Sequence, residues 1–272
     1  MTLAELVARL ERAGIDSAQH DARELFRAFS GMGGGYLPMS AESSSPELIA
    51  AAERRERREP LQYIVGEVGF YREEYLVNEA VLIPRADTEH LVDYAVKHIP
   101  SGERFADLCT GSGCVAISTL KNTKDTRAIA IDISREALSV ALKNAEKNGV
   151  ADRLTLIESD VLGKIDIPDG SLFAVLSNPP YVSDSAYEAL EPEIYKEPKC
   201  AFIGGEDGGD FYRAIVPAAK KMIKPEGFIA LEIGYDQREL LILIGKENGL
   251  LTEIIRDYSD NDRVAVLRFP EA

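Results

Sequence analysis

The stretch Val175-Leu176-Ser177-Asn178-Pro179-Pro180-Tyr181 decides the predicted fold. The apolar run from Leu172 to Leu176 is typical of a buried strand, and the chain passes from it through Asn178 into two prolines. Proline fixes its own φ and disfavours a helical backbone at the residue before it. We therefore expect the Asn178 side chain to emerge at the carboxyl end of a strand, where open α/β sheets bind ligands.

This turn offers two hydrogen-bond acceptors, the side-chain oxygen of Asn178 and the carbonyl of Pro179. Two acceptors suit the two N–H groups of a planar –NH₂ group, and Tyr181 adds an aromatic face. The pattern predicts a site that holds an amide or amino nitrogen with its lone pair directed at an electrophile. Asn178 and Pro179 are the expected catalytic groups, and they share the substrate-binding turn with Pro180 and Tyr181. An ordinary strand-ending turn is the alternative interpretation.

Strands and helices alternate around this turn, from Gly102 to the end of the chain. The alternation predicts an α/β domain built on a parallel, doubly wound sheet. One helix is expected to end near Leu120 and another to cover residues 134–148. The expected strands are residues 105–108, 128–131, 154–158, 172–176, 228–233, 251–257 and 263–269.

The chain before Gly102 has a different pattern and predicts separate parts. Residues 1–60 contain three amphipathic segments and predict a small helical domain. Short extended pieces, among them residues 62–66 and 81–85, predict a β-hairpin linker over residues 61–84. Residues 85–272 then form the α/β domain, in which Asp87 and Thr88 are expected to cap a helix that runs through His98.

Local signals place the three N-terminal helices. Thr2 and Glu5 form a capping box for the first helix, and Ser17 begins the second. Glycines within residues 31–35 are expected to end the second helix. Pro46 begins the third, which is expected to end at Glu59. The charged run over residues 53–58 is expected to be a solvated face, with contact to a partner as the alternative.

The acidic composition argues against a broad nucleic-acid-binding surface. The 272-residue chain has a net charge of −15, from 46 acidic and 31 basic residues. A surface that follows a phosphate backbone needs clustered Lys and Arg. Cys109, Cys114 and Cys200 form no metal-ligand pattern, so no metal is expected. Charges throughout the N-terminal segment and the lack of a membrane-length apolar run predict a cytoplasmic protein with no membrane partner.

A glycine-rich turn and two acids are expected beside Asn178. The loop from Cys109 to Gly113 joins a predicted strand to a helix, so a ligand can approach its backbone near a helix N-terminus. Asp132 ends the next strand about 20 residues later, where a carboxylate can bind ribose hydroxyls. Asp160 follows the third strand and can accept from an adenine amino group, with helix capping as the alternative role. The expected cofactor-binding residues are Cys109, Thr110, Gly111, Ser112, Gly113, Asp132, Asp160, Val161 and Asn178.

Longer motifs extend this set over nearly the whole chain. They are Pro60-Leu61-Gln62-Tyr63-Ile64-x-Gly66, Leu82-Ile83-Pro84-Arg85-x-Asp87-Thr88-Glu89, Asn178-Pro179-Pro180-Tyr181, Glu197-Pro198 before Gly204-Gly205-x-Asp207-Gly208, and Asp262-Arg263-Val264. With these motifs the chain resembles the class I methyltransferases that use S-adenosylmethionine, and within them the peptide-chain release factor glutamine methyltransferase family. The Leu-Ile-Pro-Arg stretch and the helical N-terminal domain distinguish this family from DNA adenine methyltransferases.

The resemblance implies a Rossmann-like fold, S-adenosylmethionine as the cofactor and class I release factors as the protein substrate. The acceptor would be the side-chain nitrogen of the glutamine in the Gly-Gly-Gln motif, with Asn178 and the Pro179 carbonyl accepting its two hydrogens. The N-terminal domain would hold the body of the release factor, and the chain would act as a monomer without direct contact to nucleic acid. The family usually has Gly where Cys109 stands, so Cys109 is expected to have a non-glycine backbone conformation.

Two other functions fit part of the pattern. A nucleic-acid amino methyltransferase, acting on adenine N6 or guanine N2, could use the same turn, although the acidic charge argues against it. A non-enzymatic Rossmann-like binding module could keep the cofactor loop as scaffold only. Intact Asn178 and Asp132 argue against that module.

Overall fold

The computed structural model describes residues 1–32, 35–163 and 165–270. The chain forms two compact units. One consists of Met1–Glu67 with Glu191–Lys196, and the other of Val68–Leu190 with Glu197–Ala272. The expected glycine break over residues 31–35 lies partly outside the described residues.

The first unit is a helical bundle of α1 (Leu3–Arg12), α2 (Ala18–Phe29), α3 (Pro46–Glu56) and the short α4 (Leu61–Val65). The predicted capping box is confirmed, since Glu5 N donates to Thr2 Oγ1 at 3.1 Å and Thr2 N donates to Glu5 Oε2 at 2.8 Å. The apolar stripes of the helices meet in one core, which includes Leu6, Leu10, Leu25, Phe26 and Leu48.

Three local predictions for this unit are wrong. Residues 62–65 of the predicted extended piece 62–66 belong to α4, because Leu61 and Ile64 pack into the helical core, and Gly66 caps the end of the helix with φ 89°. The third helix ends at Glu56, three residues before the predicted end. Arg55 is buried rather than solvated, since its Nε donates to Asp21 Oδ2 at 2.7 Å and its Nη1 to Glu193 Oε1 at 3.0 Å.

The second unit begins with a two-stranded sheet of β1 (Glu67–Phe70), whose first residue belongs to the helical unit, and β2 (Glu73–Leu76). Residues 81–85, predicted as an extended piece, form no strand. Asn144, which is fully buried, fixes β2 to the rest of the unit. Its Oδ1 accepts from Leu76 N at 2.6 Å, and its Nδ2 donates to Leu76 O and to Ser112 O. One side chain therefore joins the hairpin to the predicted cofactor loop.

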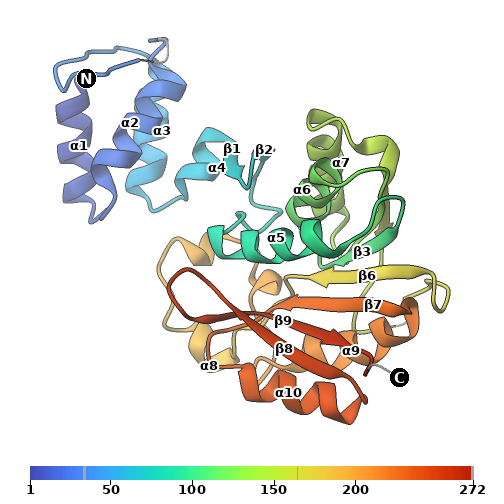
Figure 1. The fold of residues 1–272 in the computed structure, drawn as a ribbon. Helices are drawn as coiled ribbons and strands as arrows, with labels where there is room; N and C mark the ends of the chain where they lie inside the picture. The colour runs from blue at the N-terminus through green and yellow to red at the C-terminus, as the bar shows by residue number, and fades with distance from the viewer. Residues whose placement is uncertain (33–34, 164, 271–272) are drawn as a thin grey trace. The chain divides into compact units, whose positions relative to one another are not determined.

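The main sheet has seven strands in the order β5-β4-β3-β6-β7-β9-β8 (Figure 1). β3 to β7 are parallel, as predicted, whereas β9 runs antiparallel to both β7 and β8. The chain starts in the middle at β3, moves outward through β4 and β5, and then returns to β6 beside β3. The strands are β3 (Arg104–Leu108), β4 (Arg127–Asp132), β5 (Leu154–Glu158), β6 (Leu172–Ser177), β7 (Ile223–Glu232), β8 (Leu251–Arg256) and β9 (Asp262–Arg268).

Helices cover both faces of this sheet (Figure 1). One face packs against α5 (Glu89–His98), α6 (Cys114–Asn122) and α7 (Arg135–Lys147), and the other against α9 (Asp210–Met222) and α10 (Arg238–Glu247). Successive strand residues alternate between the two cores, as Phe105 and Ala106 do. The predicted α/β fold is confirmed. Shorter helices are η1 (Ala86–Thr88), η2 (Ala151–Arg153), α8 (Asp184–Tyr187), η3 (Ile194–Lys196) and η4 (Lys199–Ala201).

The helices in the described part of the chain are too short or too polar to cross a membrane.

Thr88 is the N-cap residue of α5 and the helix runs to His98, as predicted, but the Thr88 side chain makes no capping hydrogen bond. It is used elsewhere, at the carboxyl end of β6.

Candidate active site

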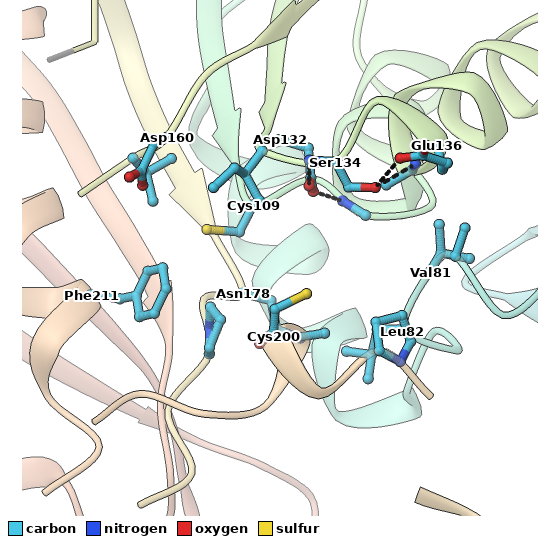
Figure 2. Close-up of a pocket in the computed structure, with 18 of the residues that line it drawn as sticks. Val81, Leu82, Cys109, Asp132, Ser134, Glu136, Asp160, Asn178, Cys200 and Phe211 are labelled. Carbon is cyan, nitrogen blue, oxygen red and sulfur yellow. Dashed lines mark hydrogen bonds between the residues drawn. The ribbon is translucent and has the colours of Figure 1, made fainter. Parts of the chain in front are cut away.

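A cavity of about 400 Å³ lies at the carboxyl ends of β3, β4 and β6 (Figure 2). Its wall includes Cys109 after β3, Asp132 at the end of β4, and Asn178 after β6. The chain reverses its direction of growth between β3 and β6, and such a switch point is where open α/β sheets bind ligands. The topology therefore places this cavity where a ligand site is expected.

The turn after β3 is tightly held by backbone and side-chain contacts. Gly111 N donates to Asp132 Oδ2 at 2.8 Å, and Thr110 Oγ1 donates to Asp107 Oδ2 at 2.6 Å. Gly113 has φ 82°, and a Cβ there would lie 2.8 Å from Ile117 Cδ1. Burial raises the Asp107 pKa to about 7, although hydrogen bonds from Thr110 and from Ala116 N lower it. The loop is thus fixed before any ligand arrives.

Asp132 is shared between this loop and the next helix. Its Oδ2 accepts from Gly111 N, and its Oδ1 accepts from Ser134 N at 2.9 Å. Burial raises the Asp132 pKa, and these two backbone donors lower it. Each carboxylate oxygen accepts one backbone hydrogen bond, and each can accept another from a ligand hydroxyl at the cavity wall.

The wall beyond β5 combines one acid with apolar side chains. Asp160 is exposed at the cavity and its Oδ1 accepts from Leu162 N at 2.9 Å. Val161, Leu162 and the 60% exposed Ile133 line the same side. An acceptor beside an apolar surface suits a flat ring that carries an amino group.

The turn after β6 presents the Asn178 side chain to the cavity. Asn178 Nδ2 donates to Thr88 Oγ1 at 3.0 Å. Because this contact uses the nitrogen of the amide, Oδ1 is the end available to a ligand. Pro179 and Pro180 are buried, and the Tyr181 hydroxyl donates to Glu232 Oε1 at 3.1 Å.

Gly208 and Gln237, from two other segments, support this turn. Gln237 Nε2 donates to Tyr181 O at 3.0 Å. Gly208 approaches the same backbone so closely that a Cβ there would lie 2.3 Å from Tyr181 O, and its φ is 75°. Only glycine combines that conformation with that approach. The glycine motif predicted from the sequence therefore braces the Asn-Pro-Pro-Tyr turn.

Two other sequence motifs meet beside the cavity. Glu197 is buried, its Oε2 accepts from Ile83 N at 2.9 Å, and its other oxygen pairs with Arg85. Pro198 and Leu82, the neighbours of these residues, line the cavity wall. Within the described residues no cluster of three or more His, Cys, Asp or Glu side chains could hold a metal ion.

Comparisons with known proteins identify the families to which this chain is similar. Residues 2–66 match the family model for the PrmC N-terminal domain, and residues 87–206 match that for the methyltransferase small domain. The release factor glutamine methyltransferase of Caulobacter vibrioides is 36% identical over 95% of this chain and 92% of its own length. The enzyme of that name from Geobacter sulfurreducens is 36% identical over 86% of this chain and 83% of its own.

The chain belongs to the release factor glutamine methyltransferase family. Among solved structures, the ribosomal protein L11 methylase from Lactobacillus delbrueckii subsp. bulgaricus matches with a TM-score of 0.52 and 18% identity, over 71% of this chain and 84% of its own. That likeness concerns the fold. The sequence-based assignment to a methyltransferase of this family is confirmed.

The predicted site residues of this family member are only partly brought together at the cavity. Thr110, Ser112, Gly113, Pro179 and Tyr181 do not line it. The predicted residues that do line the cavity are Cys109, Gly111, Asp132, Asp160, Val161, Asn178 and Pro180. Whether each residue contacts a ligand stays a prediction.

Sequence reasoning missed several residues of this family member's site. Thr88 was expected to cap a helix, and no role was expected for Glu232 or for the cavity residues Cys200 and Phe211. Thr88 belongs to a motif that the sequence singled out. Its contact with Asn178 joins two distant segments of the chain, and no local sequence pattern encodes such a contact.

The expected conformation of Cys109 is wrong. Its φ is 59°, in the left-handed region that favours glycine, because the turn after β3 must reverse direction so that Thr110 N can donate to Ile131 O at 3.0 Å. Cys109 therefore adopts a backbone conformation that favours glycine instead of avoiding it.

This strain predicts the stability of Cys109 variants. Cys109→Gly should change the free energy of unfolding by less than about 1 kcal/mol, because relief of strain offsets lost chain entropy. Cys109→Val should destabilise by about 1–3 kcal/mol, because a β-branched side chain resists a positive φ. Urea unfolding of the full chain measures both. Equal stabilities for the two variants would contradict the left-handed turn.

Proposed function

We propose that this chain transfers a methyl group from S-adenosylmethionine to the side-chain amide nitrogen of the glutamine in the Gly-Gly-Gln motif of class I release factors. The observation that carries the proposal is the engaged amide nitrogen of Asn178, which leaves an acceptor oxygen available at the cavity. The names of the relatives support the class of substrate.

The residues at the cavity fit S-adenosylmethionine. Asp132 has acceptor capacity for the two ribose hydroxyls, and Asp160 beside Val161 suits the adenine ring and its amino group. The glycine loop over residues 109–113 offers close approach of its backbone. When bound, S-adenosylmethionine supplies an electrophilic methyl group on a sulfonium.

An amide nitrogen is a poor nucleophile, because its lone pair is delocalised into the carbonyl. Asn178 Oδ1 and the Pro179 carbonyl would accept the two amide hydrogens of the glutamine, which polarises the nitrogen and fixes its direction. The stiff Pro179-Pro180 turn keeps these acceptors in place, so little reorganisation is needed during the reaction. Pro180, which lines the cavity, would shape the remainder of the glutamine subsite, and Tyr181 would hold the turn through its contacts with Glu232 and Gln237.

The division of labour in the chain is part of the proposal. Residues 1–60, together with α4 packed into their core, would hold the body of the release factor, the remainder of residues 61–84 would act as the linker, and residues 85–272 would transfer the methyl group. A helical unit with its own core supports a separate docking role. A monomeric state, a cytoplasmic location and the lack of a nucleic-acid partner stay predictions, of which the net charge of −15 supports the last.

Methyl transfer to purified class I release factor tests the proposal directly. Mass spectrometry of the peptide that contains Gly-Gly-Gln should find one added methyl group on the glutamine, and none after the glutamine is replaced by alanine. DNA and ribosomal RNA serve as parallel acceptors. Modification of a nucleic acid, with an unmodified release factor, would replace this proposal with the nucleic-acid amino methyltransferase.

Asn178 variants test the role of the acceptor oxygen. Asn178→Ala should lower the single-turnover rate by about 10²–10³, because it removes one preorganised hydrogen-bonding group. Asn178→Asp should also be slow, because it brings an extra charge to a site built for a neutral amide. Cofactor affinity, measured by calorimetry, should stay within a few-fold for both. A turnover of Asn178→Ala within threefold of the parent would contradict this role.

Asp132 should control cofactor affinity rather than rate. Asp132→Ala should weaken S-adenosylmethionine binding by more than about tenfold, because two ribose hydroxyls lose a charged acceptor worth about 1.5–3 kcal/mol per bond. Glu158→Gln is a matched control, since Glu158 ends the neighbouring strand, pairs with Arg135 and does not line the cavity. It should bind within threefold of the parent. An unchanged dissociation constant for Asp132→Ala would remove Asp132 from the cofactor site.

A further inference from the structure

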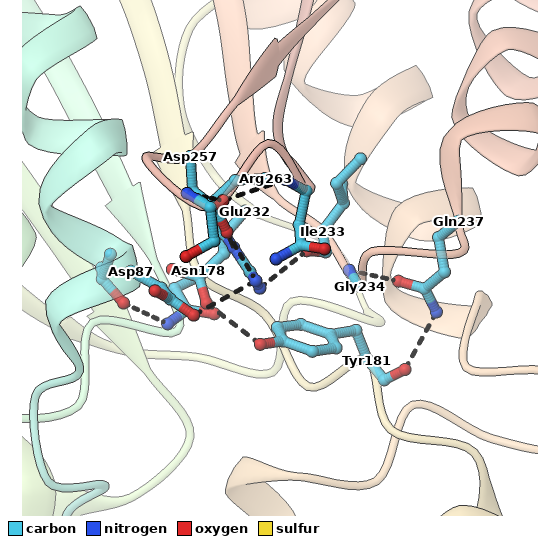
Figure 3. Close-up of polar contacts among 12 residues, drawn as sticks. Asp87, Asn178, Tyr181, Glu232, Ile233, Gly234, Gln237, Asp257 and Arg263 are labelled. Atoms are coloured by element: carbon cyan, nitrogen blue, oxygen red, sulfur yellow. Dashed lines mark hydrogen bonds and ion pairs between the residues drawn. The ribbon is translucent and has the colours of Figure 1, made fainter.

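A buried carboxylate lies directly behind the Asn-Pro-Pro-Tyr turn (Figure 3). Glu232, the last residue of β7, is 1% exposed. Its Oε1 accepts from the Tyr181 hydroxyl, while its Oε2 has no complete hydrogen bond to any of the residues described. A buried carboxylate oxygen without a partner is costly, so its retention points to a function.

No cation neutralises this carboxylate directly in the part of the chain that the structure describes. Arg263 on β9 is the nearby cation that acts on it, but the guanidinium pairs with Asp257 at 3.1 Å and with Asp87 at 3.2 Å. Burial raises the Glu232 pKa to about 7, and Asp87 adds to this effect, whereas hydrogen bonds from the Thr88 and Tyr181 hydroxyls and the charge of Arg263 lower it. The Tyr212 hydroxyl on α9 contacts the backbone oxygen of Glu232.

Thr88 connects this carboxylate to Asn178. Thr88 is 2% exposed, and its hydroxyl accepts from Asn178 Nδ2 at 3.0 Å. It also lies close enough to the Glu232 carboxylate to lower the pKa of that group, although the two make no complete hydrogen bond. The hydroxyl can donate one proton, and an ionised carboxylate can only accept. A Thr88 proton directed at Glu232 leaves the Thr88 oxygen to accept from Asn178.

The direction of the hydrogen bonds from Asn178 through Thr88 to Glu232 decides which end of the Asn178 amide reaches the cavity. A hydroxyl can face either end of an amide, because it can donate to the oxygen or accept from the nitrogen. With Thr88 alone, both orientations of the Asn178 amide would be satisfied. A fixed acceptor behind Thr88 permits one of them, in which Nδ2 faces Thr88 and Oδ1 faces the cavity.

We propose that Glu232 is a positioning residue for methyl transfer, which acts through Thr88 to hold the Asn178 amide with its oxygen toward the acceptor nitrogen. The inference rests on the proposed function, and it extends that function to three residues on separate segments: η1, the turn after β6, and β7. It gives the Asp-Thr part of the Leu-Ile-Pro-Arg motif a role in the reaction. Asp87 pairs with Arg263 behind the same carboxylate.

Variants that change the direction of these hydrogen bonds test this proposal. Glu232→Gln can donate to Thr88 and permits the reversed amide, so its single-turnover rate at saturating substrates should fall about 10- to 100-fold, with cofactor affinity within threefold. Thr88→Val, which lacks the hydroxyl, should lose as much, whereas Thr88→Ser should keep a rate near the parent's. Glu73→Gln is the matched control, because Glu73 is another buried carboxylate that accepts a hydroxyl, from Ser118 at 2.8 Å.

The pH profile separates positioning from a merely structural role. The rate of the parent should rise as the pH passes through about 7, because Glu232 accepts without donating only when it is ionised. Glu232→Gln should lack this rise. A rate of Glu232→Gln within threefold of the parent, or a loss matched by Glu73→Gln, would overturn the proposal, as would an unchanged pH profile.

A second readout does not depend on the substrate. The side-chain amide of Asn178 in ¹⁵N-labelled protein should show slowed hydrogen exchange in the parent and in Thr88→Ser, and lose this protection in Glu232→Gln and Thr88→Val. An unprotected amide in the parent would overturn the inference. A parent that shows the protection but methylates no release factor would contradict the proposed function and leave the hydrogen-bond chain supported.

Discussion

The hydrogen bond from Asn178 Nδ2 to the Thr88 hydroxyl is the interaction on which the geometry of this site depends. It joins two segments that lie 90 residues apart in the chain. Without it the amide at the carboxyl end of β6 could turn over, since its oxygen and nitrogen are similar in size and differ only in hydrogen bonding. Several other contacts in the α/β unit hold the turn that carries Asn178.

That support comes from both sides of the turn. On one side, Gly208 lies close against the Tyr181 backbone and Gln237 donates a hydrogen bond to it. Behind it, Glu232 binds the Tyr181 hydroxyl and influences the Thr88 hydroxyl. Across the cavity, Asp132 holds both the glycine loop and the start of α7 through two backbone N–H groups. Rigid walls of this kind suit a reaction that depends on positioning and needs no general base strong enough to deprotonate an amide.

Local sequence signals predicted the parts that local forces determine. The Thr2 capping box, the strand over residues 128–131 and the helix expected over residues 134–148 depend mainly on neighbouring residues, and all three are present. Residues 62–66 were misread because β-branched and aromatic residues favour strands in isolation, while packing of Leu61 and Ile64 decides for α4. Cys109 was misread because the turn, not the residue, fixes the positive φ. Glu232 could not be found from the sequence, since an acid at a strand end is identified as buried only once α5 and α9 cover the sheet.

The central claim is that the oxygen of Asn178 faces the acceptor nitrogen. The most direct measurement is a high-resolution structure of this chain with S-adenosylhomocysteine and a class I release factor. We expect the amide nitrogen of the Gly-Gly-Gln glutamine to lie about 3 Å from both Asn178 Oδ1 and the Pro179 carbonyl, with Asn178 Nδ2 still donating to Thr88. A glutamine whose carbonyl oxygen meets Asn178 Nδ2, or whose amide lies away from the turn after β6, would contradict it.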